Sequence, residues 1–228
     1  MRWATMRAEH GRPLFRDRQH AGEVLARRLA EMPLAPPVVV VALPRGGVPV
    51  AAVVARALKA PLDLMLVRKI SAPWQPELAV AAVVDGEEPV LVVDEEIASG
   101  TGADARYIAR SEVEAWREIE RRRALYLAGR EPLPLQGATV ILVDDGIATG
   151  TTMRAALQAL RQRGAARRVV AVPVAPHETL LRLRDQAETL VCLAEPQPFG
   201  AVGAHYGEFH QVGDDEVIEA LASVSRGP

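Results

Sequence analysis

The stretch "VILVDDGIATGTTM" (Val140–Met153) decides the expected fold. An apolar, strand-like run ends in two adjacent carboxylates, Asp144 and Asp145, and passes directly into a loop of glycine and threonine. The loop leads into a predicted helix, Thr151–Arg163, which Gly164 ends. Because a helix N-terminus offers unpaired N–H groups and a partial positive charge, this turn predicts a phosphate site that needs no lysine.

The residue types of the loop suit a sugar phosphate. Gly146 and Gly150 let the backbone approach a ligand, and the hydroxyls of Thr149, Thr151 and Thr152 can add hydrogen bonds. The loop is not a Walker loop, because no GK[ST] follows. The two carboxylates only accept hydrogen bonds, and a ribose offers them two vicinal donors. The pattern therefore predicts a ribose phosphate ligand; the alternative is a pair of strand-end aspartates that cap a helix.

Apolar strands and helices alternate on both sides of this stretch. The predicted strands are Pro36–Pro44, Leu62–Val67, Arg168–Val174 and Glu188–Ala194, and the predicted helices are Val48–Leu58 and His177–Gln186. Such alternation is typical of an α/β protein whose central parallel sheet is flanked by helices. Ligands bind beyond the carboxyl ends of the strands in such sheets.

The middle of the chain has a different pattern. Residues 77–94 read as a hairpin that turns near Asp85–Gly86, and Ala103–Leu127 reads as one long charged helix. Pro132–Gly137 reads as a link back into the core. The middle is therefore expected to depart from the strand and helix alternation.

Composition excludes several classes of protein. The chain has 228 residues and a formal net charge of −2, so no global basic field would hold it on nucleic acid or an anionic membrane. The longest uncharged apolar run, Pro36–Pro44, is far shorter than the ~20 residues of a membrane span. The charged N-terminus argues against a secretory signal, so a cytoplasmic protein is expected. A single cysteine, Cys192, excludes an intrachain disulfide.

The stretch "VILVDDGIATGTT" is similar to the phosphoribosyl diphosphate (PRPP) signature of the type I phosphoribosyltransferases. The resemblance implies that Asp144 and Asp145 hold the ribose 2′- and 3′-hydroxyls and that the following loop holds the 5′-phosphate. The implied phosphate loop consists of Gly146, Ile147, Ala148, Thr149, Gly150, Thr151 and Thr152. It also implies a single domain over residues 1–228, with a small hood built from peripheral segments, the N-terminal part and about residues 175–228.

Another stretch agrees with the resemblance. In "VALPRGGVPVA" the first strand ends in Pro44, Arg45, Gly46 and Gly47, where the family has a loop that binds pyrophosphate through backbone N–H groups. Two glycines between a strand and a helix are more often only a tight turn.

In "LMLVRKISAPWQPE" the second predicted strand ends in Arg68 and Lys69, similar to the pair that opens the family's flexible catalytic loop. Lys69 is one of only two lysines among 27 basic residues, the other being Lys59. Arg68 and Lys69 are therefore catalytic candidates beside Asp144 and Asp145; the alternative for Lys69 is a solvated lysine at a strand end.

The resemblance spans roughly Val38–Val174. The chain as a whole, including "FRDRQHAG" (Phe15–Gly22), looks most like a branch of predicted phosphoribosyltransferases whose acceptor is unknown.

A second stretch, "VVDEEIASGTG" (Val92–Gly102), repeats the signature pattern and is called the echo stretch below. Asp94 and Glu95 align with the two aspartates, but Glu96 aligns with Gly146. A carboxylate at the mouth of the loop would repel a phosphate. We therefore expect the echo stretch to be a helix N-terminus whose acids suit the helix dipole.

Residues Pro198–His210, "PFGAVGAHYGEFH", gather aromatic side chains in a chain with only 4% aromatic residues. A nucleobase needs a flat stacking partner, so Phe199, Tyr206 and Phe209 are candidates for a base-facing wall. The alternative is that they pack the C-terminal edge.

The resemblance implies Mg²⁺-dependent transfer of the 5-phosphoribosyl group from PRPP to a nitrogen acceptor, expected to be a nucleobase, with release of pyrophosphate. Mg²⁺ would be held mainly by PRPP oxygens and water. The expected assembly is a homodimer, without nucleic acid or membrane partners. The alternative is a PRPP-sensing regulator that has lost the chemistry.

Overall fold

The computed structural model of the protein describes residues 13–86 and 89–224. These residues form two compact units. The first unit comprises residues 13–64, 132–150 and 160–224, and the second comprises residues 65–131 and 151–159. No helix within the described ranges is both long enough and apolar enough to cross a membrane.

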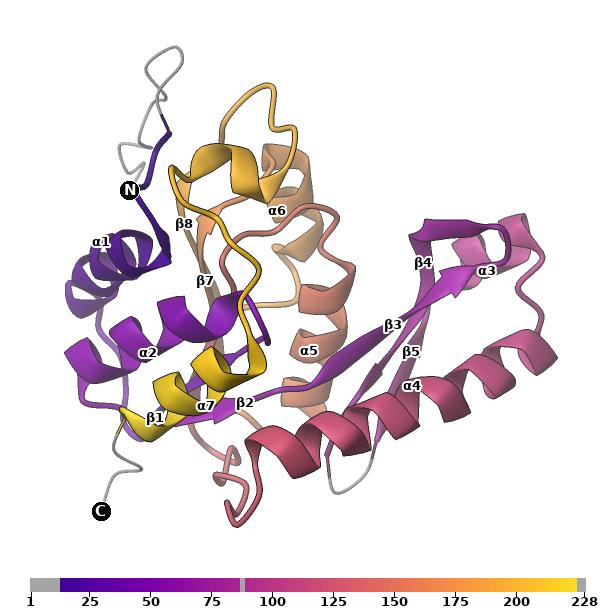
Figure 1. Cartoon of the computed structure of the whole chain (residues 1–228), viewed down its shortest axis with the longest axis horizontal. Helices are drawn as coiled ribbons and strands as arrows, with labels where there is room; N and C mark the ends of the chain where they lie inside the picture. The colour runs from indigo at the N-terminus through magenta and orange to yellow at the C-terminus, as the bar shows by residue number, and fades with distance from the viewer. Residues whose placement is uncertain (1–12, 87–88, 225–228) are drawn as a thin grey trace. The chain divides into compact units, whose positions relative to one another are not determined.

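The first unit is built on a five-stranded parallel sheet with the strand order β2-β1-β6-β7-β8 (Figure 1). Its strands are β1 (Val38–Ala42), β2 (Leu62–Leu64), β6 (Thr139–Val143), β7 (Arg167–Val174) and β8 (Thr189–Ala194). All five residues of β6 are buried, as a strand covered on both faces requires. The predicted α/β fold with a central parallel sheet is confirmed.

Helices of the first unit pack on this sheet or on one another. They are α1 (Arg18–Ala30), α2 (Gly47–Leu58), α6 (His177–Leu183) and α7 (Asp214–Ala222), with a 3₁₀ turn, η1, at Val202–His205. Helix α2 packs against both α1 and α7. Gly22 permits the close α1 contact, because a Cβ there would lie 2.8 Å from the Val53 Cβ.

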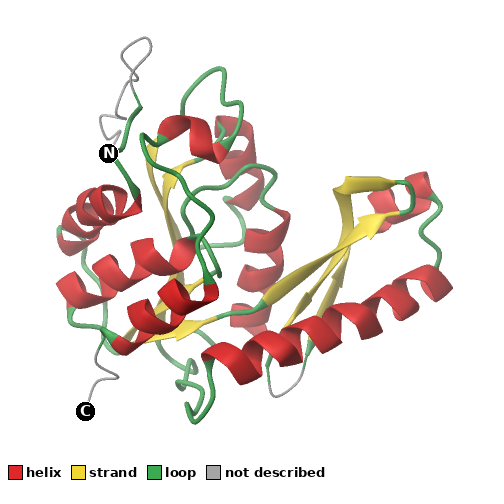
Figure 2. Cartoon of the chain, viewed as in Figure 1, coloured by secondary structure: helices red, strands yellow, loops and turns green. Residues whose placement is uncertain are grey.

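The second unit is a three-stranded antiparallel sheet, β3-β4-β5, backed by helices (Figure 2). Its elements are β3 (Val67–Ala72), β4 (Gln75–Val84), β5 (Val90–Val93), α3 (Glu95–Thr101) and α4 (Ala105–Tyr126). Helix α4 buries one stripe of side chains, Ile108, Ala115, Ile119 and Tyr126. The predicted hairpin and long helix are confirmed, except that the helix begins at Ala105. Helix α5 (Thr151–Gln162) follows the signature loop.

The predicted strand Leu62–Val67 is wrong in its extent. Strand β2 ends at Leu64, and Val67 begins β3 in the other sheet. Met65 and Leu66 between them are buried, so the apolar run continues through the point where the chain changes sheets. Hydrophobic pattern alone could not locate that point.

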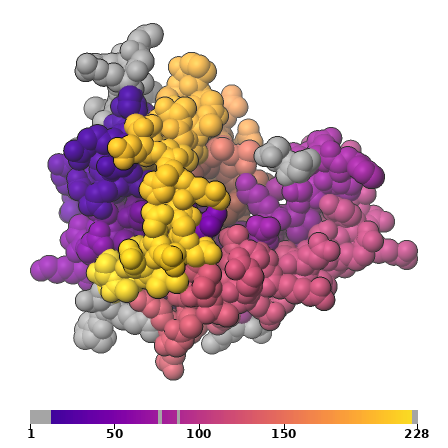
Figure 3. Space-filling model, in the orientation of Figure 1, coloured from indigo at the N-terminus to yellow at the C-terminus, as the bar shows by residue number. Residues whose placement is uncertain are grey.

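The small subdomain is present, but its segments differ from those expected. The N-terminal part and residues 175–224 belong to the unit of the parallel sheet, and the central residues form the separate unit. Backbone hydrogen bonds hold the two peripheral segments together: Phe15 N donates to His205 O, and Gly207 N donates to Phe15 O. Figure 3 shows these C-terminal residues (yellow) against the N-terminal ones (indigo).

Candidate functional site

The signature stretch forms a strand, a loop and a helix, as predicted. Strand β6 ends at Val143, so the two aspartates emerge at the carboxyl edge of the parallel sheet. Helix α5 begins only at Thr151, which leaves residues 144–150 as the loop. Ile147 N donates to Val174 O at 2.9 Å, and Thr179 Oγ1 donates to Ala148 O at 2.7 Å. The loop is thus held from β7 and from α6.

The glycines of this loop allow close packing. A Cβ at Gly146 would lie 2.5 Å from Val202 Cγ1 and 2.9 Å from Val174 Cγ2. Gly150 has a φ of +82°, in the left-handed region that favours glycine. A side chain at either position would change the path of the loop.

The loop after β1 lies against the two aspartates. A Cβ at Gly46 would lie 2.1 Å from Asp145 Oδ2, and one at Gly47 would lie 2.9 Å from the Asp144 Cα. The cause is the parallel pairing of β1 with β6, which brings the ends of both strands together. The Pro44–Arg45 peptide bond in this loop is cis. The structure thus brings together the predicted pyrophosphate loop and the predicted ribose site.

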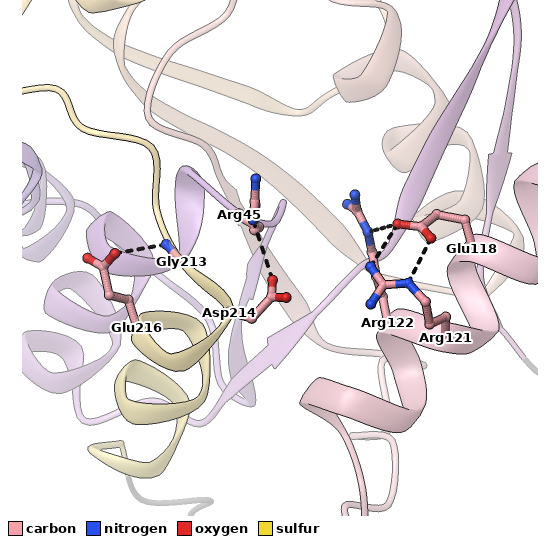
Figure 4. A network of polar contacts seen from close by, with 7 residues as sticks. All are labelled: Arg45, Glu118, Arg121, Arg122, Gly213, Asp214 and Glu216. Atoms are coloured by element: carbon pink, nitrogen blue, oxygen red, sulfur yellow. Dashed lines mark hydrogen bonds and ion pairs between the residues drawn. The ribbon is translucent and has the colours of Figure 1, made fainter.

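Arg45 points toward the N-terminus of α7. Its Nη1 lies 3.5 Å from Asp214 Oδ1 (Figure 4). In the same first turn of α7, Glu216 accepts from Gly213 N at 2.8 Å. Two segments that are far apart in the sequence therefore share a charge pair beside the loop.

Asp145 is buried, with 9% of its surface exposed, and it pairs with Arg18. Arg18 Nε donates to Asp145 Oδ2 at 2.9 Å, and Arg18 Nη2 lies 2.8 Å from the same oxygen. Burial raises the pKa of the Asp145 carboxyl, and the Arg18 guanidinium acts against that rise. Asp144 Oδ1 accepts from the Asp145 N–H at 2.9 Å.

Sequence reasoning assigned no role to Arg18. It stands in the quoted stretch Phe15–Gly22, but 127 positions separate it from its partner. The local signal is the cap of α1: Asp17 accepts from His20 N at 2.7 Å and so fixes where the helix begins. A single arginine in a helical pattern gives no sign of a buried carboxylate elsewhere.

Tyr206 packs inside the first unit. Only 6% of it is exposed, and its hydroxyl donates to Asp145 O at 2.6 Å. Its ring lies 5.5 Å from the Phe15 ring and 5.0 Å from the Phe209 ring. Burial raises the pKa of Tyr206 above its ordinary value. The packing alternative therefore fits Tyr206 better than a base-facing role.

Phe209 and Phe199 are less buried. Phe209 is 38% exposed, and the Arg18 guanidinium carbon lies 3.9 Å from its ring centroid. Phe199 is half-buried against His205, whose Nε2 lies 2.8 Å from Phe199 O. Both rings keep some accessible surface.

Arg68 and Lys69 lie in the second unit, within β3 rather than at the end of a preceding strand. Both are exposed, and Lys69 is paired with Ala82 of β4. They line an open cavity of about 270 Å³ together with residues of α4. The α4 residues include Tyr107, Ser111, Glu114 and Glu118.

Glu118, which lines this cavity, accepts hydrogen bonds from two arginines of α4. It accepts from Arg121 Nε at 2.9 Å and from Arg122 Nε at 2.7 Å (Figure 4). These two guanidinium groups lower the pKa of Glu118 to about 2. The carboxylate therefore stays ionised at neutral pH.

The echo stretch is a helix start, as predicted. Asp94 caps α3 by accepting from Ile97 N at 3.2 Å, and it accepts from Arg154 Nη2 at 2.7 Å. The hydrogen bond from Arg154 lowers the pKa of Asp94. Glu95 and Glu96 are exposed in the first turn, where acids favour the helix dipole.

Within residues 13–86 and 89–224, no group of three or more His, Cys, Asp or Glu side chains is placed to hold a metal ion. The carboxyl edge of β6 instead presents carboxylate and threonine oxygens, which are compatible with a hydrated Mg²⁺.

Comparison with known proteins agrees with this site. The family model described as the phosphoribosyl transferase domain matches residues 19–206. Two curated proteins from strains of Mycobacterium tuberculosis, provisionally named phosphoribosyl transferases, are each 46% identical over 213 residues. The match covers 93% of this chain and 47% of each relative, so the chain spans about half the length of these relatives.

A crystal structure of a protein from Thermus thermophilus is also similar. It is 44% identical with a TM-score of 0.80, and the match covers 96% of this chain and all of that one. The family match extends over most of the chain and includes both glycine loops and the two aspartates. The chain therefore belongs to the phosphoribosyl transferase domain family.

Proposed function

We propose that the protein transfers the 5-phosphoribosyl group from PRPP to a nitrogen acceptor and releases pyrophosphate, in a reaction that depends on Mg²⁺. The observation that carries this proposal is the meeting of two glycine loops with a carboxylate pair at the carboxyl edge of the parallel sheet. Carboxylates accept hydrogen bonds from ribose hydroxyls, and backbone N–H groups beside glycine suit phosphate oxygens.

The roles of the residues follow from this placement. Asp144 and Asp145 would accept hydrogen bonds from the ribose. The signature loop, together with Thr151 and Thr152 at the start of α5, would bind the 5′-phosphate. Gly46 and Gly47, where a side chain would collide with the aspartates, would let a diphosphate approach the backbone. Holding the sugar at both ends would favour its passage through a cationic state, since positioning lowers the barrier.

Mg²⁺ would enter with PRPP, held largely by substrate oxygens and water, and would offset the negative charge of the diphosphate. The acceptor is proposed to be a nucleobase, because Phe199 and Phe209 keep accessible ring surface. A cytoplasmic homodimer remains a prediction from the sequence.

Calorimetry with PRPP and Mg²⁺ tests the ribose site. We expect binding by the wild type and a loss of more than about tenfold in Asp144→Asn combined with Asp145→Asn, because each charge-assisted hydrogen bond contributes ~1.5–3 kcal/mol. Asp144→Asn alone keeps the Arg18 pair intact and should already weaken binding severalfold. Unchanged affinity in the double variant, with the fold confirmed by circular dichroism, would contradict the assignment.

Turnover is tested through Lys69, a candidate that rests on the family resemblance. In an enzyme a cation that meets the departing pyrophosphate matters more in the transition state than in the ground state. Lys69→Ala should then lower kcat by about 10²-fold while PRPP affinity changes much less. The control is Lys59→Asn, which changes the other lysine at a left-handed position that asparagine tolerates.

Pyrophosphate release with a panel of purines and pyrimidines gives the other half of this test. Release with any base supports a transferase. The absence of pyrophosphate release with every base of the panel, together with tight PRPP binding, would favour the PRPP-sensing regulator.

A further inference from the structure

Arg18 contacts three other residues of the first unit through its guanidinium group. Its Nε and Nη2 both meet Asp145 Oδ2, and its Nη1 donates to His210 O at 2.8 Å. Its guanidinium carbon lies over the ring of Phe209. Only 7% of Arg18 is exposed, so its orientation is fixed by these contacts. A buried arginine remains charged and needs such partners.

Asp145 depends on this cation. Asp144 Oδ1 accepts from its backbone N–H, and the buried Tyr206 hydroxyl donates to its backbone carbonyl. Burial favours the protonated form of a carboxyl group, and it raises the pKa of Asp145. Among the residues that the structure describes, Arg18 is the cation that bonds to the Asp145 carboxylate. Without it, Asp145 would bind a proton more readily and accept hydrogen bonds less well.

We propose that Arg18 is a positioning residue of the ribose site, which balances the charge of the Asp145 carboxylate and fixes its orientation so that it can accept a ribose hydroxyl. This inference rests on the proposed function. The same guanidinium joins Asp145 to the segment of Phe209 and His210, so it couples the ribose site to the segment proposed to face the acceptor.

The test compares Arg18→Gln and Arg18→Lys with a matched control, Arg27→Gln, which changes an exposed arginine on the same helix. PRPP affinity is measured by calorimetry from pH 6 to pH 9 with Mg²⁺. We expect Arg18→Gln to weaken binding by more than about tenfold at pH 6 and by much less at pH 9, because Asp145 regains its charge as the pH rises. Taking the ratio to the wild type removes the titration of PRPP itself. Arg18→Lys should recover part of the loss, and Arg27→Gln should match the wild type.

A second measurement does not require PRPP. Carbon-13 NMR of the aspartate carboxyl groups, with Asp145→Asn to assign the resonance, follows the titration of Asp145 directly. We expect its midpoint to move to higher pH in Arg18→Gln and to stay in place in Arg27→Gln. Circular dichroism checks that each variant is folded.

The outcomes are distinct. An unchanged Asp145 titration in folded Arg18→Gln, or a loss of PRPP affinity that is the same at every pH, would overturn the positioning role alone, since a purely structural role gives no pH dependence. A wild-type protein without measurable PRPP binding would overturn the proposed function and this inference together, and that result appears before any substitution is made.

Discussion

The signature stretch and the echo stretch have similar sequences but different structures. In both, an apolar strand is followed by adjacent acids, two in the signature stretch and three in the echo stretch, and then by glycine and threonine. After β6 the chain forms a loop and begins α5 only at Thr151, whereas after β5 the helix α3 begins at Glu95, directly after its cap Asp94. Strand β6 lies in the middle of a parallel sheet, and β5 lies at the edge of an antiparallel one. The sheet position therefore decides which copy can bring a second loop against its acids.

One residue separates the two stretches most sharply. Gly146 has no room for a Cβ, while Glu96 at the aligned position is exposed in the first turn of α3. A glutamate is compatible with a helix start and incompatible with a packed phosphate loop.

Substitution at Gly146 is expected to have the largest effect, and the converse substitution at Glu96 a small one. Gly146→Glu is expected to weaken PRPP binding more than about 100-fold, because the side chain collides with Val202 and puts a charge near the phosphate, at a cost of a few kcal/mol. The converse change, Glu96→Gly, should leave PRPP affinity unchanged and lower the free energy of unfolding by about 1 kcal/mol or less. Calorimetry and denaturant unfolding measure both. Retained binding in a folded Gly146→Glu variant would show that the loop does not hold the phosphate.

The next largest effect is a difference in stability between variants of Asp145 in the signature stretch and Asp94 in the echo stretch. Asp145→Asn should lower the free energy of unfolding by about 3 kcal/mol at pH 7, because it leaves the Arg18 charge buried without its counterion. The lower end of the usual range applies, since asparagine keeps an oxygen that Arg18 can donate to. Asp94→Asn should cost about 1 kcal/mol or less, because Arg154 is 37% exposed and solvent screens the pair. Equal losses in urea unfolding would contradict the difference in burial.

The pH dependence of Asp94→Asn sharpens this result. The pKa of Asp94 is lowered in the folded protein, chiefly by the hydrogen bond from Arg154. The carboxylate thus stabilises the fold above its unfolded pKa of about 3.9, and this contribution is lost as the pH falls through the lowered folded value. The stability difference between wild type and Asp94→Asn should therefore be present at pH 7 and vanish in strong acid.

The sequence predicted the parts of the molecule that depend on local pattern. Continuous apolar runs predicted the parallel strands, and the signature predicted the loop between Asp144 and Thr151. The change of sheet at Met65 and Leu66 was missed, because a buried connection has the same pattern as a buried strand. The Arg18–Asp145 pair was missed because it depends on tertiary packing between distant segments.

The smallest expected effect concerns PRPP binding by the echo stretch. Asp94→Asn combined with Glu95→Gln should leave PRPP affinity within a factor of about three, the scatter typical of substitutions at the surface. The reason is that the Asp94 carboxylate is occupied by the Ile97 N–H and Arg154, and Glu95 is exposed on a short helix. Calorimetry under the conditions used for the Asp144 and Asp145 variants makes the two results comparable. If the echo variant lost PRPP binding while the double aspartate variant of the signature stretch kept it, the ribose site would lie in the echo stretch. The position of the strand in its sheet would then not decide which stretch binds PRPP.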